Sequence, residues 1–331
     1  MYHIATLPQT DRRVLFLNTA QKKALHPAIV EKDFWVCLTL NYLFSHSQWK
    51  DAFIFKGGTS LSKAYHLIER FSEDIDLILD WRLINYRDEP WQSRSKTQQD
   101  KVNKQMNNDG GIFIKKKLLP IMQKDLYNIL GKEPDIYINE KDKQIIDFAY
   151  PNIFHNIYLR PQIKLEIGPL AERVPHESTK IISYAAEEYG EFFKQKNSNV
   201  NTIAAERTFW EKITILHKIA HKNKNKIMPQ RYSRHYYDLY CMFHSPLKAK
   251  AYANKELLEQ DIRFKIKFYA SNNSGYDTAK IGSLLLLPQK EDEKVLQEDY
   301  IHMQNMIYGK IPSYEDMMET IKVLEREVNE L

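Results

Sequence analysis

The spacing of apolar residues divides the chain into a first part that mixes strands with helices and a last part that is mostly helical. Residues 11–46 keep helical spacing, with Pro27 suited to a first helical turn. Runs of β-branched and aromatic residues at 53–55 and 75–79 predict two strands, and apolar spacing within residues 61–68 predicts a helix between them. The first pattern is therefore strand, helix, strand.

Alternating apolar and polar residues predict a second group of strands further along the chain. Residues 136–138 and 145–148 are expected to pair as a hairpin. In residues 162–168 the apolar side chains share one face, which leaves Lys164 and Glu166 on the other. This third strand is expected to bury one face only.

Some charged or polar stretches carry weaker signals. Residues 93–128 are strongly charged, and the Asn-Asn-Asp-Gly-Gly run at 107–111 favours a break. Residues 170–200 are expected to form a linker with one helical piece. Three consecutive charged residues of the first helical stretch are expected to be solvated or to cap a helix: Glu31, Lys32 and Asp33.

Helical spacing dominates the last part of the chain. The strongest amphipathic helix spans residues 204–221, and Lys212 lies at the edge of its buried stripe, about 70° from the centre, where a side chain can line a cleft. Residues 233–243 predict another helix, and residues 254–331 predict two or three more, with breaks near 271–275 and 309–312.

Length and composition allow two domains with substantial cores. The chain has 331 residues, of which 43% are hydrophobic, and a net charge of +5 with a pI near 8.8. We expect an α+β fold, with a mixed-sheet domain over residues 1–180, N-terminal helices included, and a mostly helical domain over residues 181–331. The positive charge permits an anionic partner such as nucleic acid without requiring one.

Cysteine usage and hydropathy exclude several classes of protein. Cys37 and Cys241 form neither a disulfide framework nor a metal-binding pattern, which is typical of a reducing cytoplasm. The first residues lack the features of a signal peptide, and no apolar run is long enough to span a membrane. A cytoplasmic protein without membrane association is expected.

Candidate chemistry centres on the glycine pair. Gly57 and Gly58 break the first strand and lead into a helix that Thr59 or Ser60 could cap. The N–H groups and the dipole at the start of a helix favour a phosphate. The turn is therefore a candidate phosphate cradle.

Two aspartates follow the cradle on the next predicted strand. Successive strand side chains alternate between faces, so Asp74 and Asp76 share one face. Neighbouring carboxylates repel unless a cation lies between them, and such oxygen ligands suit Mg²⁺ or Mn²⁺. A lone D-x-D triplet is more often a pair of solvated aspartates. The adjacent glycine turn and apolar flanks favour a site here.

Four stretches of the chain resemble one known family. GGTS followed by RFSEDIDL is similar to the glycine and D-x-D motifs of the DNA polymerase β-like nucleotidyltransferase superfamily. The longer segment FKGGTSLSKAY, together with the later segments ERTFWEK and RHYYDL, resembles the AbiEii/AbiGii toxin family of bacterial abortive-infection and toxin–antitoxin systems. The resemblance covers about residues 29–240 and implies a nucleotidyltransferase fold followed by a helical C-terminal domain.

The resemblance implies catalytic and metal-binding roles. Asp74 and Asp76 would hold two divalent ions, with Glu166 completing the set, while Lys212 would neutralise a terminal phosphate and Asp238 would orient Lys212 or the nucleotide. From the residues alone, Glu166 could instead be a surface glutamate, Lys212 a solvated lysine and Asp238 a helix-surface acid. The implied nucleotide-binding residues are Gly57, Gly58, Thr59, Ser60, Arg70, Ser72 and Lys212.

The implied reaction moves a nucleoside monophosphate from an NTP to an acceptor. RNA, and the tRNA 3′ end in particular, is the expected acceptor, and a cognate antitoxin is the expected protein partner. Two rivals remain: a non-catalytic module that binds nucleotide or a partner, and a two-metal nuclease, for which a triphosphate cradle has no use. The lysines among residues 93–128 form either a solvated helix face or a patch for a nucleic-acid backbone: Lys96, Lys101, Lys104, Lys115, Lys116 and Lys117.

Overall fold

The computed structural model describes residues 1–72, 74–84, 89–156, 159–269 and 274–331, which fold into two compact units. The first unit comprises Met1–Ala64 and Ser72–Thr202, and the second comprises Tyr65–Phe71 and Ile203–Leu331. Neither unit is one continuous stretch of chain, because residues 65–71 belong to the second unit although both flanking segments belong to the first.

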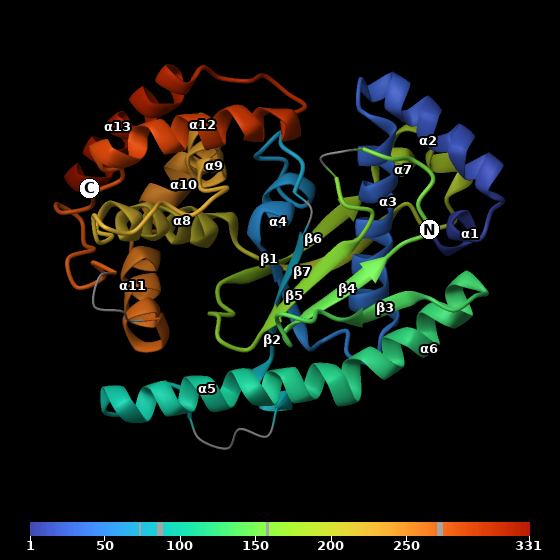
Figure 1. Ribbon diagram of the computed structural model, residues 1–331, viewed down its shortest axis with the longest axis horizontal. Coiled ribbons are helices and arrows are strands. Elements are labelled where there is room, and N and C mark those ends of the chain that lie inside the picture. Colours follow the sequence, from blue (N-terminus) through green and yellow to red (C-terminus); the bar gives the residue numbers. More distant parts are fainter. Residues whose placement is uncertain (73, 85–88, 157–158, 270–273) are drawn as a thin grey trace. The chain divides into compact units, whose positions relative to one another are not determined.

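The first unit is a mixed sheet with helices (Figure 1). Its strands are β1 (Phe53–Lys56), β2 (Asp74–Leu79), β3 (Asp135–Ile138), β4 (Ile145–Ala149), β5 (Ile163–Gly168), β6 (His176–Ile182) and β7 (Asn197–Ile203). Its α-helices are α1 (Tyr2–Ala5), α2 (Gln9–Lys23), α3 (Pro27–Asn41), α4 (Gly57–Lys63), α5 (Lys96–Phe113), α6 (Leu119–Leu130) and α7 (Tyr184–Glu188). Shorter turns are the π-helices η1 (Tyr42–His46) and η3 (Ile114–Leu118) and the 3₁₀-helices η2 (Trp81–Leu83) and η4 (Gly190–Phe192).

The seven strands follow the order β3-β4-β5-β2-β1-β7-β6. β1 and β2 pair antiparallel, β2 and β5 pair parallel, and β3 and β4 form the expected hairpin. The mixed sheet confirms the α+β fold. Helix α3 packs on the apolar face, where Trp35 stacks on Tyr150 and meets Phe148 edge-on. Ile75 and Leu165 lie on this same face, so the polar residues of β2 and β5 point to the opposite one.

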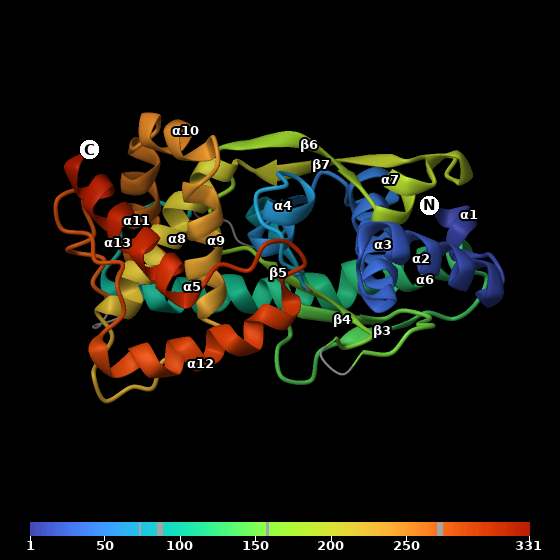
Figure 2. The same ribbon diagram turned by 90° about the horizontal axis from the view of Figure 1, so that it is seen from above.

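The expectation of a linker over residues 170–200 is wrong. β6 and β7 lie side by side in the sheet, and residue 180, the expected domain boundary, falls inside β6 (Figure 2). β6 shows no alternation because most of its residues are exposed, and β7 buries Ser198 and Thr202 beside Val200. Because the buried positions of β7 include Ser and Thr, its sequence lacks the alternation of apolar and polar residues from which a strand is predicted.

The expected break at residues 107–111 is also wrong. α5 runs through both glycines and continues through η3 into α6 as a long helical rod (Figure 1). Gly110 and Gly111 serve packing, since a Cβ on Gly110 would lie 3.2 Å from Pro169 Cδ and one on Gly111 would lie 3.3 Å from Lys143 Cβ. The capping box of Ser95 and Gln98 fixes the start of α5.

The charged residues of α3 are buried, which contradicts the expectation that they are solvated. Glu31 accepts hydrogen bonds from the backbone N–H groups of Ile153 and Phe154, and Lys32 donates to the Arg160 carbonyl at 3.0 Å. Asp33 is 1% exposed, and its carboxylate pairs with Lys63 Nζ at 2.7 Å. Each charged group of this run therefore has a partner, as burial requires.

The second unit is helical. Its elements are α8 (Ala205–Ala220), α9 (Ser233–Phe243), α10 (Leu247–Ala253), α11 (Glu256–Tyr269), α12 (Glu293–Met303) and α13 (Tyr314–Glu330), with the 3₁₀-helices η5 (Lys290–Asp292) and η6 (Gln304–Met306). α13 buries Met317, Ile321, Leu324 and Val328, which recur at helical spacing. The expected helices at 204–221 and 233–243 are confirmed, whereas most of the break expected at 271–275 lies outside the described residues.

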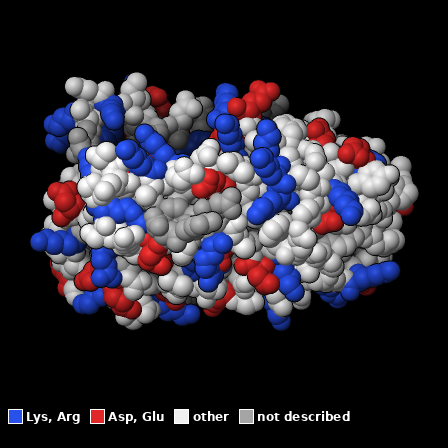
Figure 3. All heavy atoms as spheres, turned by 90° about the horizontal axis from the view of Figure 1, so that it is seen from below, with Lys and Arg blue, Asp and Glu red and all other residues white. Residues whose placement is uncertain are grey.

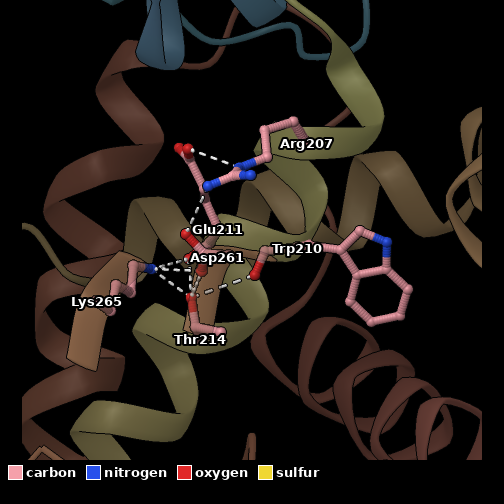
Figure 4. A network of polar contacts seen from close by, with 6 residues as sticks. All are labelled: Arg207, Trp210, Glu211, Thr214, Asp261 and Lys265. Atoms are coloured by element: carbon pink, nitrogen blue, oxygen red, sulfur yellow. Dashed lines mark hydrogen bonds and ion pairs between the residues drawn. The ribbon is translucent and has the colours of Figure 1, made fainter. Parts of the chain in front are cut away.

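A buried charge network joins α8 to α11 (Figure 4). Asp261 accepts from Thr214 Oγ1 at 2.5 Å and pairs with Lys265 at 3.0 Å and with Arg207 at 3.5 Å. Lys265 also donates to the Thr214 hydroxyl and to the Glu211 carbonyl. The contacts fix how the two helices pack. Of the helices formed by described residues, none has the length and apolar character needed to cross a membrane.

We predict that acid destabilises the second unit through His217. Its Nδ1 accepts the Leu285 N–H at 3.0 Å, so Nε2 carries the proton donated to the Gly275 carbonyl at 2.9 Å. Burial lowers the pKa of His217 to about 4, below the ordinary 6.5. A neutral ring in the folded state stabilises fully above pH 6.5 and loses this contribution as the pH falls toward 4, about 3 kcal/mol in all.

Urea unfolding between pH 7 and pH 4 measures this loss. His217→Gln keeps an acceptor and a donor but does not titrate, so its stability should fall less steeply over the same range. If the unfolding free energies of wild type and His217→Gln fall equally steeply with falling pH, His217 is not the group responsible.

Candidate functional site

Three carboxylates share the polar face of the sheet in the first unit. Asp74 and Asp76 lie two residues apart on β2, and Asp76 stands directly opposite Glu166 on the parallel neighbour β5. Asp74 stands opposite Lys164. The sequence argument placed Asp74 and Asp76 on one strand face, and the family resemblance added Glu166 to them. The strand register confirms that all three lie on the same face of the sheet.

The backbone of Gly57 lies close to the Asp76 side chain, so the glycine turn lies against this face of the sheet. Gly57 has a φ of +80°, and a Cβ there would lie 1.9 Å from Asp76 Oδ2. Only glycine combines this backbone angle with so close a contact. Lys56, the last residue of β1, is the register partner of Asp76 on the other side. The start of α4 and the carboxylate of Asp76 are therefore neighbours.

The glycine turn differs from expectation in two details. α4 begins at Gly57, so Thr59 and Ser60 lie inside it and do not cap it. Their hydroxyls are buried and donate to backbone carbonyls, Thr59 to Asp74 at 2.5 Å and Ser60 to Gly57 at 2.8 Å. The helix ends at Lys63, short of the expected residue 68. Gly58 lies at the second position of this first turn, where backbone N–H groups have no helical acceptor.

A buried ion pair that the sequence argument missed fastens the end of α4 to α3. Lys63 Nζ lies 2.7 Å from Asp33 Oδ1, and both side chains are at most 5% exposed. The other Asp33 oxygen accepts the Tyr184 N–H at 2.7 Å, and the Tyr184 ring lies 3.9 Å from Lys63 Nζ. Burial alone would lower the pKa of Lys63, but the attraction of Asp33 outweighs it and raises that pKa.

The second unit contains a separate charge cluster, made of one residue from each of three sequence motifs, RFSEDIDL, ERTFWEK and RHYYDL. Arg70 donates two hydrogen bonds to Asp238, from Nε to Oδ1 at 2.7 Å and from Nη2 to Oδ2 at 2.8 Å. Lys212 Nζ lies 2.7 Å from Asp238 Oδ2 and 3.4 Å from His235 Nδ1. Arg70, Lys212 and Asp238 are all buried. Asp238 is therefore the shared anion of two cations and not a surface acid.

Burial and neighbouring charges together set the pKa values of the ionisable groups in this cluster. Burial would raise the pKa of Asp238, but the attraction of Arg70 and Lys212 outweighs it and holds that pKa far below its ordinary value. Burial lowers the pKa of Lys212, and Asp238 offsets this only in part. Burial and the charge of Lys212 hold the pKa of His235 well below its ordinary value, so the neutral ring can accept at Nδ1.

Hydrogen bonds in the second unit hold Arg70 in place. Arg70 forms an antiparallel bridge with Ile307, where the Phe71 N–H donates to the Met306 carbonyl at 2.7 Å and the Tyr308 N–H donates to the Glu69 carbonyl at 2.9 Å. The sequence argument expected Arg70 to donate to phosphate, whereas in the structure its side chain donates to Asp238 and, at 3.5 Å, to the Phe71 carbonyl. Ser72, the first residue of the returning segment, is partly exposed.

The carboxylate face fits a divalent cation by its donor set. Asp74, Asp76 and Glu166 offer hard oxygen ligands from facing strand positions, which is the chemistry that Mg²⁺ and Mn²⁺ prefer. Among the described residues, no three His, Cys, Asp or Glu side chains already converge closely enough to hold an ion.

Comparison with known proteins found one matching family model and several similar solved structures. The model described as nucleotidyl transferase AbiEii toxin of type IV toxin–antitoxin systems matches residues 39–321. Among solved structures, the chain is similar to MenT4, a nucleotidyltransferase toxin from Mycobacterium tuberculosis H37Rv, with 15% identity, a TM-score of 0.48, and 96% of this chain and 97% of that chain covered. It is also similar to JHP933 from Helicobacter pylori, with 14% identity, a TM-score of 0.40, and 91% and 92% covered. No curated protein sequence matches.

We predict that Gly57→Ala displaces the Asp76 carboxylate. The new Cβ would lie only 1.9 Å from Asp76 Oδ2 and would also strain a left-handed backbone angle, at a cost of about 1–2 kcal/mol for the backbone alone. Gly131→Ala is the matched control, because its φ is +68° but nothing lies within 4 Å of its Cβ position. Urea unfolding should show a larger loss for Gly57→Ala, and equal losses would argue against the close approach.

We predict that Asp238→Asn destabilises the protein by about 3–5 kcal/mol, because Arg70 and Lys212 would stay buried without a counter-charge. Glu319→Gln, which breaks an exposed pair with Lys322 in the same unit, should cost at most about 1 kcal/mol. Chemical denaturation measures both. An Asp238→Asn protein as stable as the control variant would refute the counter-charge role.

Proposed function

Since the chain belongs to the AbiEii family of nucleotidyl transferase toxins of type IV toxin–antitoxin systems, we propose that it transfers a nucleoside monophosphate from an NTP to an RNA hydroxyl and releases pyrophosphate. The observation that carries the proposal is the strand register that sets Asp76 opposite Glu166, next to the glycine turn. A nuclease would need similar carboxylates but has no use for a triphosphate cradle. The glycine turn therefore favours transfer over hydrolysis of a nucleic acid.

We assign the metal-binding role to Asp74, Asp76 and Glu166. A divalent cation such as Mg²⁺ or Mn²⁺ would supply positive charge that polarises the attacking hydroxyl and offsets charge on the phosphates. Asp74 and Asp76 bind on one side and Glu166 on the other, because the register fixes them on facing strands. Lys164, opposite Asp74, reduces the repulsion among the carboxylates.

We assign phosphate binding to the backbone of the glycine turn. The hydroxyls of Thr59 and Ser60 are bonded to carbonyls, so their contribution is to shape the turn. The N–H groups of Gly57, Gly58 and Thr59, which have no helical acceptor, are the donors for phosphate oxygens. The closeness of Gly57 to Asp76 would keep the bound phosphates beside the carboxylates.

We assign supporting roles in the same reaction to the charge cluster of the second unit. Lys212 would neutralise charge on the departing pyrophosphate, Asp238 would hold its ammonium in place, and Arg70 would fix Asp238 by two hydrogen bonds. Only three residues separate Arg70 from Asp74 in the sequence, and Ser72 between them would add a hydroxyl donor.

The acceptor and the protein partner are proposed from the family resemblance. We propose RNA as the acceptor, with the tRNA 3′ end first among RNAs. A cognate antitoxin is the proposed protein partner. A non-catalytic module with the same fold would bind NTP without releasing pyrophosphate, so one assay separates the two possibilities.

We predict that Asp76→Asn abolishes transfer without unfolding the protein. The substitution removes one of two facing carboxylates, which relieves repulsion in the sheet while weakening cation binding. Purified wild type, labelled NTPs, Mg²⁺ and total RNA should give labelled RNA, and the variant should give at least 10²-fold less. Asp147→Asn, which alters a carboxylate bonded to Asn139 and Gln162, is the control and should keep its activity. Undiminished labelling by a folded Asp76→Asn protein would sink the proposed function.

A further inference from the structure

Positive charge is concentrated in one helical stretch of the first unit. Residues 94–132 contain nine Lys or Arg and three Asp, a net charge of +6, whereas the whole chain carries +5. The rest of the protein is therefore close to neutral. Uneven charge of this kind is typical of a surface that meets a polyanion.

The charges lie on the outward side of the helical rod. Helical spacing puts one stripe of α5 and η3 on a single side, and all of its members are exposed: Lys101, Lys104, Asn108, Ile112 and Lys115. The other side of the rod is buried against the unit, through Met106, Gly110 and Phe113. From Lys101 to Lys117 the rod extends about 24 Å.

The π-helix η3 adds to the stripe. Lys115, Lys116 and Lys117 are three consecutive residues, and all three are exposed. π-Helices of this kind are rare and are frequent at functional sites. Lys101, Lys104, Lys115 and Lys116 form no ion pair with any described residue. Their charge is therefore available to a partner. Figure 3 looks onto this side, where Lys and Arg side chains lie along the surface with acidic ones between them.

We infer that this lysine face, defined as the exposed side of α5 and η3, binds the phosphate backbone of an RNA, which rests on the proposed transfer to an RNA acceptor. A duplex places one charge per about 1.7 Å along its axis, so the rod faces many phosphates. The interspersed amides of Gln105 and Asn108 add neutral donors for phosphate and ribose oxygens. An anionic membrane fits less well, because the apolar side of α5 is packed against the unit and cannot enter lipid.

Binding of a labelled RNA duplex of roughly 20 base pairs to the full-length protein, across a range of salt, tests the inference. In Lys104→Gln/Lys115→Gln/Lys116→Gln, affinity should fall at least tenfold, and the slope of log K against log salt should shrink by about 2–3, since each lysine neutralises about one phosphate. NTP affinity should stay within twofold of wild type. An unchanged slope would overturn the inference.

The matched control is Lys180→Gln/Lys194→Gln. Both lysines are exposed in the same unit, one on β6 and one shortly before β7, and neither has an ion pair with a described residue. This variant should bind RNA within twofold of wild type, and an equal loss would show that only total charge matters. Vesicles rich in anionic lipid form a third arm of the experiment. If the protein binds these vesicles but does not bind RNA, the inference is also overturned.

Asp76→Asn separates failure of the surface from failure of the proposed function. It should bind the duplex as wild type does and transfer no nucleotide. If wild type binds RNA through the lysine face but labels none, the proposed transfer fails and the surface stands. If wild type labels RNA while the triple variant keeps full RNA affinity, the surface fails and the transfer stands.

Discussion

Two carboxylates on facing strand positions repel each other, and the site depends on a sheet that keeps them there. The parallel register of β2 with β5 sets Asp76 opposite Glu166, and the apolar side chains behind them, packed under α3, resist any slip. A shift of one residue would turn the acidic side chains into the core. The hydrophobic face thus sets the position of the polar one, and the glycine turn exploits that fixed position by approaching Asp76 closely.

The sequence predicted the centre of the sheet and its β3 edge, and missed the other edge, formed by β7 and β6. β2 and β5 carry strong alternation because one face is buried and the other is polar, so the alternation was enough to infer the shared face of Asp74 and Asp76 and the outward face of Glu166. Only the family resemblance placed Glu166 beside the two aspartates. β6 and β7 could not be inferred in this way, since an exposed strand and a strand that buries Ser198 and Thr202 lack that alternation. Helix α5 was hidden for a related reason: its glycines serve tight packing and not a turn.

Buried charge was the other limit of the sequence argument. A single charged residue in a helical stretch is usually solvated, and nothing local distinguishes Asp33 or Asp238 from such a residue. What buries them is a partner far along the chain, Lys63 for Asp33 and Arg70 with Lys212 for Asp238. Only the family resemblance pointed to Lys212 and Asp238, and no signal of either kind pointed to Asp33. Pairings between distant residues are set by the fold, which spacing alone does not specify.

The excursion of residues 65–71 into the second unit has a consequence for the order in which the protein can mature. A chain emerging from the ribosome presents Glu69 and Arg70 well before their partners Tyr308 and Asp238, and Asp238 lies 168 residues after Arg70. The segment between α4 and β2 therefore stays without these partners until Tyr308 has been made. A chain that stops before Tyr308 would have every strand of the sheet and would still lack the backbone contacts that hold residues 69–71.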